Sequence, residues 1–110
     1  MDLIYKPKSV WETLSDDDMD SVNSLSNDYI TFLNKGKTER ECTKQIIEVA
    51  KAKGFESLSE VLKKGSIKKG TKVYLNNKDK SVILMVIGED MTDGMNIIGA
   101  HIDSPRLDIK

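Results

Sequence analysis

The hydrophobic periodicity of the sequence changes at Gly70, and this change limits the possible fold more than any other feature. Before Gly70, apolar residues recur at spacings of three and four, which is typical of amphipathic helices. After it, β-branched residues dominate and the spacing falls to two, which is typical of strands. The strand expected over 81–87 is apolar on both faces, so it should lie inside a sheet that is covered on both faces. Helices followed by such strands predict an α/β fold in which helices cover a mixed sheet.

Capping residues predict where the first helix begins and ends. Ser15 is a candidate N-cap, and Asp18 stands three residues later, as in a capping box. Gly36 is a plausible helix stop. We therefore expect a helix over about residues 16–35.

A second helix is expected after Thr38, which forms a capping-box pattern with Glu41. Gly54 suits the left-handed position that closes this helix. Its expected buried residues are Cys42, Ile46, Val49 and Ala50. Since Cys42 belongs to this apolar stripe, a buried structural role is favoured over a reactive thiol. A short third helix is expected over 57–64.

Three strands are expected beyond Gly70. Segments 72–75 and 81–87 flank the turn-rich residues 76–80, a pattern typical of a β-hairpin with a five-residue connection. After a surface loop, a further strand is expected over 96–102.

Composition excludes several classes of function. The chain has one cysteine and one histidine, which excludes a disulfide framework and any zinc site built from several Cys or His residues of this chain. Its net charge of −1 disfavours nucleic-acid partners and binding to an anionic membrane surface. The longest apolar run, 82–87, is too short to span a membrane, and no signal-peptide pattern is present. We expect a cytoplasmic protein.

His101 and Asp103 are the candidate chemical residues. In a strand they would project to the same face, where a neutral imidazole can bind a metal while the carboxylate orients it. The spacing alone also fits a structural or surface His–Asp pair. It fits a general-base dyad as well, although Ser104 would alternate to the opposite face and is poorly placed as the nucleophile.

The run Ile-Gly-Ala-His-Ile-Asp-Ser-Pro-Arg-Leu-Asp at 98–108 closely resembles the N-terminal metal-binding motif of the aspartyl aminopeptidase family, especially its bacterial branch. The likeness extends to segments 10–12, 37–41, 72–74 and 96–99, and so covers nearly all of the chain. It implies a di-zinc exopeptidase of α/β/α sandwich architecture that removes N-terminal Asp or Glu residues from peptides and forms homo-oligomers. It also implies that His101 binds one Zn²⁺ ion and that Asp103 has the catalytic role of orienting or polarising this ligand.

The same resemblance implies that the other zinc ligands and the glutamate base lie downstream. We therefore expect residues 1–110 to be the N-terminal part of a metallopeptidase catalytic domain, without the rest of that domain or any inserted oligomerisation domain. One imidazole and one carboxylate do not hold a catalytic zinc, so the isolated chain should be inactive. The alternative is a stand-alone, non-catalytic α/β interaction module or a truncated remnant.

Overall fold

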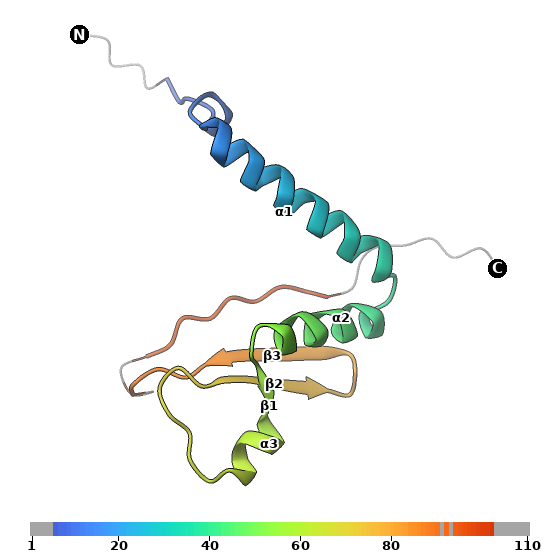
Figure 1. Cartoon of the computed structure of the whole chain (residues 1–110), viewed down its shortest axis with the longest axis vertical. Coiled ribbons are helices and arrows are strands. Elements are labelled where there is room, and N and C mark those ends of the chain that lie inside the picture. The colour runs from blue at the N-terminus through green and yellow to red at the C-terminus, as the bar shows by residue number, and fades with distance from the viewer. Residues whose placement is uncertain (1–5, 91, 93, 103–110) are drawn as a thin grey trace, which may run out of the picture. The chain divides into compact units, whose positions relative to one another are not determined.

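The computed structural model describes residues 6–90, 92 and 94–102 (Figure 1). Within these ranges, helices come first and a three-stranded mixed sheet follows, so the predicted α/β class is confirmed. The chain divides into two compact units, Met1–Thr31 and Phe32–Lys110, which are described in turn. No helix in the described part of the chain is both long and apolar enough to cross a membrane.

The first unit contains a short 3-10 helix, η1 (Val10–Glu12), which the sequence did not predict, and most of helix α1 (Asp16–Lys35). The backbone N–H of Asp18 donates to Ser15 Oγ at 3.2 Å, and the backbone N–H of Ser15 donates to Asp18 Oδ2 at 3.0 Å. These reciprocal bonds satisfy donors that the first helical turn leaves without partners. The predicted bounds of α1 are confirmed.

In the second unit, helix α2 (Glu39–Ala52) begins with the predicted capping box. The backbone N–H of Glu41 donates to Thr38 Oγ1 at 3.2 Å, and the Glu41 carboxylate accepts from the backbone N–H of Thr38 at 3.0 Å. At the other end Gly54 has a φ of +84°, and the N–H of Phe55 reaches back to the Ala50 carbonyl at 3.0 Å. This is a Schellman motif, in which glycine avoids the strain of a left-handed residue.

The buried stripe of α2 differs from the prediction at Val49. Cys42, Thr43 and Ala50 are buried and Ile46 is half-buried, whereas Val49 is exposed. Each residue turns a helical side chain by about 100°, so the inclusion of Thr43 moves the centre of the stripe away from Val49. The prediction that Cys42 is buried is confirmed.

The sheet has the order β1-β2-β3, with β1 (Glu56–Ser57) parallel to β2 (Lys72–Asn77) and β3 (Ser81–Val86) antiparallel to β2. Helix α3 (Leu58–Lys63) follows β1 directly and confirms the predicted third helix. Strand β1 itself was not predicted, because two residues are too few to show a periodicity.

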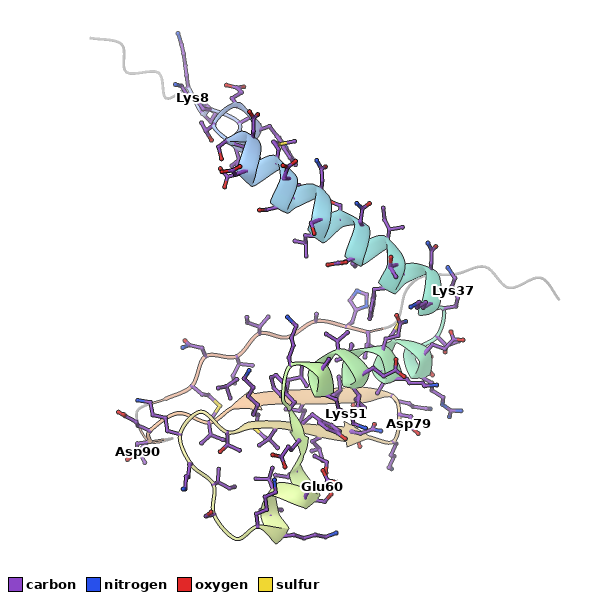
Figure 2. All side chains as sticks on the ribbon, viewed as in Figure 1. Lys8, Lys37, Lys51, Glu60, Asp79 and Asp90 are labelled. Carbon is purple, nitrogen blue, oxygen red and sulfur yellow. The ribbon has the colours of Figure 1, made fainter. Side chains whose placement is uncertain are left out.

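The hairpin between β2 and β3 is tighter than predicted. Its connection comprises residues 78–80, and Lys78 and Asp79 have φ values of 55° and 57°. They are the two central residues of the four-residue turn 77–80, which the hydrogen bond from the Lys80 N–H to the Asn77 carbonyl closes at 3.1 Å. Positive φ at both central residues is typical of a type I′ turn, whose twist matches that of the flanking strands. Asp79 therefore lies at the tip of the hairpin (Figure 2), and the asparagines before it belong to β2.

A β-bulge marks the start of the hairpin at Gly70, where the sequence periodicity changes. The N–H of Gly70 donates to the Ile87 carbonyl at 2.7 Å, while the N–H of Ile87 donates to the Thr71 carbonyl at 2.9 Å. Gly70 and Thr71 thus lie opposite the single residue Ile87, and Gly70 has a φ of +83°. This is the arrangement of a bulge whose first residue is a left-handed glycine.

The core of the second unit is small. Helix α2 packs on β2 and β3, and α3 packs on β1 and β2. Val73 and Val61 are 0% and 2% exposed. The prediction that 81–87 is covered on both faces is wrong for the described residues, because Ile83, Leu84 and Val86 remain substantially exposed. Of the helices described within the second unit, α2 alone packs extensively on β3.

Candidate functional site

His101 lies in a segment, 94–102, that has no regular secondary structure. The expected strand over 96–102 is therefore wrong for this structure. A strand needs a neighbour to pair with its backbone N–H and C=O groups, and none of the described strands β1, β2 and β3 pairs with this segment. Ile98 is 99% exposed, so its side chain packs on no sheet.

The predicted companions of His101 in the motif lie outside the described residues. Asp103, the predicted catalytic residue, and the stretch from there to 108 are among them. The expected common face of His101 and Asp103 thus stays a prediction. The His101 side chain itself is exposed, while the neighbouring Ile102 is half-buried.

The donor atoms in the described part of the chain do not make a complete zinc site. Within residues 6–90, 92 and 94–102, no three or more His, Cys, Asp or Glu side chains gather so that they could hold a metal ion. A catalytic zinc takes three protein ligands and a water, and a structural zinc takes four ligands. The imidazole of His101 is chemically suited to be one of these ligands, so the described chain offers one member of a possible donor set.

Cys42 does not contribute to such a set. It is 7% exposed, and a Cβ atom placed on Gly36 would lie 2.7 Å from its Sγ atom. The sulfur therefore packs against the turn that joins α1 to α2. This environment is that of a small buried apolar residue, not of an accessible metal ligand.

Asp90, Lys64 and Lys69 on the second unit each have a local partner. The pKa of Asp90 is lowered by the backbone N–H of Thr92, which donates to Asp90 Oδ1 at 2.8 Å, and by the Thr92 hydroxyl, which donates at 2.7 Å. Lys64 pairs with Glu56, and Lys69 pairs with Glu89. These are exposed pairs of the kind that adds little to stability.

Comparisons with known proteins identify the family. Residues 32–110 match the model of the aminopeptidase I zinc metalloproteases (M18). The chain is 40% identical over 99% of its length to a probable M18 family aminopeptidase 1 of Clostridium acetobutylicum, of which it covers 24%. It is 37% identical over 96% of its length to the protein of the same name from Borrelia garinii, of which it covers 22%.

A third relative is the probable M18 family aminopeptidase 1 of Thermotoga maritima. The chain is 34% identical to it over 94% of its own length and covers 22% of that protein. No solved structure matches the chain. The chain thus spans about a quarter of the length of the curated relatives it matches. The matched region includes His101, and the resemblance carried by the 98–108 motif is confirmed. The chain belongs to the M18 family of aminopeptidase I zinc metalloproteases.

Proposed function

We propose that residues 1–110 form the N-terminal part of the catalytic domain of a zinc aminopeptidase, and that His101 is one of its zinc ligands. The observation that carries this proposal is the match of residues 32–110 to a zinc metalloprotease family, since this region contains the only histidine of the chain. The curated relatives bear the name of aminopeptidases, which gives the class of reaction.

Within this proposal, the two motif residues act together. One ring nitrogen of His101 would bind the metal, and the Asp103 carboxylate would accept a hydrogen bond from the other, fixing the tautomer and raising the basicity of the imidazole. Zinc supplies a Lewis acid and an activated water for hydrolysis of the peptide bond. A second zinc and the remaining ligands would belong to the part of the relatives that this chain does not cover.

The finer features follow the resemblance to aspartyl aminopeptidases. We propose that the substrates are peptides with an N-terminal Asp or Glu, and that the whole enzyme is a cytoplasmic homo-oligomer. The isolated 110-residue chain should have no peptidase activity, because its described residues supply one potential ligand where a catalytic zinc takes three.

A chimaera tests the proposal. Residues 1–110 replace the matching N-terminal segment of the Clostridium acetobutylicum relative, and zinc per chain is measured by mass spectrometry together with hydrolysis of Asp, Glu, Ala and Leu p-nitroanilides. We expect zinc binding and activity, highest on the Asp and Glu substrates. His101→Ala should lower the zinc content and abolish hydrolysis, because the replacement removes a donor atom that no other histidine of this segment supplies.

The matched control is Glu48→Gln, which changes an exposed carboxylate on α2 and should leave both readouts unchanged. Unchanged zinc content in the His101→Ala chimaera would contradict the ligand assignment. A folded chimaera with full zinc but no hydrolysis of any substrate would instead contradict the aminopeptidase assignment and favour a non-catalytic role.

A further inference from the structure

The edge of the sheet beside β1 is incomplete. Strand β1 has two residues, which pair with Val73 and Tyr74, whereas β2 continues to Asn77. After Ser57 the chain turns into α3, so no described strand pairs with the last three residues of β2 on this side. An unpaired strand edge can accept a further strand.

The register of the sheet shows which backbone groups are available there. The hydrogen bond from the N–H of Ile87 to the Thr71 carbonyl fixes the alternation of the β2–β3 ladder, so residues 71, 73, 75 and 77 bond toward β3. Residues 72, 74 and 76 therefore direct their N–H and C=O groups to the opposite edge. Since Ser57 is the partner of Tyr74, β1 ends before it reaches Asn76. The backbone of Asn76 is thus the next group on this edge that a strand could pair with.

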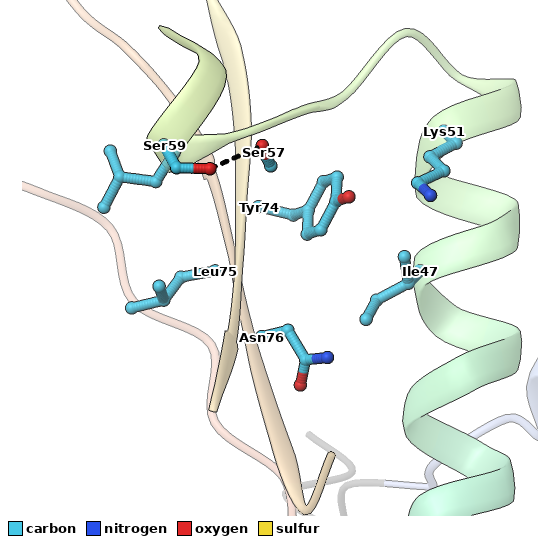
Figure 3. A pocket seen from close by; sticks show the side chains of 8 residues that line it. Ile47, Lys51, Ser57, Ser59, Tyr74, Leu75 and Asn76 are labelled. Carbon is cyan, nitrogen blue, oxygen red and sulfur yellow. Dashed lines mark hydrogen bonds between the residues drawn. The ribbon is translucent and has the colours of Figure 1, made fainter. Parts of the chain in front are cut away.

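A hollow of about 350 Å³ lies at this position, between α2, β2 and the start of α3 (Figure 3). The side chains of Tyr74 and Asn76 extend from β2 toward Ile47 and Lys51 on α2, while Leu75 points to the other side of the strand. The ammonium group of Lys51 lies 5.8 Å from the centre of the Tyr74 ring. Among the described residues, no carboxylate forms an ion pair with Lys51.

From these observations we propose that the hollow is a binding site for an extended acidic peptide segment, which adds to the edge of β2 at Asn76 and places a carboxylate at Lys51. Main-chain bonds to Asn76 give the peptide its orientation, as in other cases of strand addition. Side chains of a strand alternate between faces. An acidic residue on the α2 side meets Lys51, and its apolar neighbours meet Leu75 on the other side. The site is separate from the motif of His101 and does not rest on the proposed peptidase function.

The test uses the ¹⁵N-labelled 110-residue protein and the peptide acetyl-Ser-Val-Asp-Val-Ser-amide, followed by NMR. We expect saturable shifts of the Tyr74, Leu75 and Asn76 amide signals. Replacing Asp by Asn in the peptide, or making Lys51→Gln in the protein, should each weaken binding about two- to fivefold, the range for one exposed charge pair. Combining the two changes should weaken it no further, because each removes the same interaction. A peptide N-methylated at its three central residues should not bind.

Lys44→Gln is the matched control, since Lys44 is also an exposed lysine on α2 but does not line the hollow. It should leave the affinity unchanged, and the spectra of both variants show directly whether the fold is preserved. No saturable shifts, shifts confined to other residues, or equal affinity for the Asp and Asn peptides would each overturn the proposal. Undiminished binding of the N-methylated peptide would also overturn it, because strand addition requires the peptide N–H groups.

Discussion

The stability of the second unit should depend strongly on Val73, which is fully buried in the middle strand of the sheet. Val73→Ala removes two methylene equivalents, which cost about 0.8 kcal/mol each in transfer free energy. The cavity left behind adds to this, so we expect a loss of about 2–3 kcal/mol in the free energy of unfolding. Domains are stable by about 5–15 kcal/mol, and this one has a small core, so the loss is a large fraction of the total.

Urea denaturation followed by circular dichroism at 222 nm measures this change. The matched control is Val86→Ala, which makes the same chemical change on β3 at a side chain that is 63% exposed. Its cost should stay below about 1 kcal/mol, since mainly β-propensity is lost. The reasoning is refuted if both variants lose the same free energy of unfolding, or if Val73→Ala leaves the urea concentration at the unfolding midpoint unchanged.

Three further changes test local features of the helices. Thr38→Ala should destabilise the protein by about 1 kcal/mol in the same assay, because it removes the hydroxyl of the capping box, and Thr38→Ser should restore stability. Gly36→Ala should cost about 1–3 kcal/mol, since the new Cβ would lie 2.7 Å from Cys42 Sγ, and an unchanged midpoint would contradict this packing. Hydrogen bonds from the Ser15 hydroxyl and backbone N–H lower the pKa of the Asp18 carboxyl. The stability that this carboxylate contributes is therefore present above the pKa that Asp18 has in the unfolded chain, and it is lost as the pH falls through its lower pKa in the folded protein. An NMR titration should show that Ser15→Ala raises this pKa toward its ordinary value.

Local signals explain which parts of the fold were predictable from the sequence. The capping box of α2 involves Thr38 and Glu41, which stand three residues apart, so the sequence shows it directly. The closing glycine, Gly54, is equally local. The choice of Thr43 over Val49 for the buried stripe depends on how α2 lies on the sheet, which the sequence of the helix alone does not contain.

The non-local features were the ones missed. Strand β1 exists because Glu56 and Ser57 meet Val73 and Tyr74, residues about one helix and one loop further along the chain. The strand prediction for 96–102 was wrong because a local pattern was present without a partner strand. Its alternating pattern is suited to a sheet, but pattern alone forms no strand without a neighbour. The assignment of His101 as a zinc ligand came from the resemblance of the 98–108 run to the family motif, because the His-x-Asp spacing alone also fits a structural pair, and it stays a prediction.

The exposed segment around His101 links zinc binding to local folding. A ligand held on irregular, exposed backbone is poorly preorganised, whereas a ligand at the end of a paired strand is fixed in position. If His101 binds zinc as proposed, part of the free energy of binding should also restrict the backbone of segment 96–102. In the chimaera, zinc should therefore slow hydrogen exchange of the Ile98 and Ala100 amides, and removal of zinc with a chelator should reverse the effect. His101→Ala should abolish the protection by zinc. Protection of these amides that is the same with and without zinc would show that the segment is ordered independently of the metal, and would contradict this coupling.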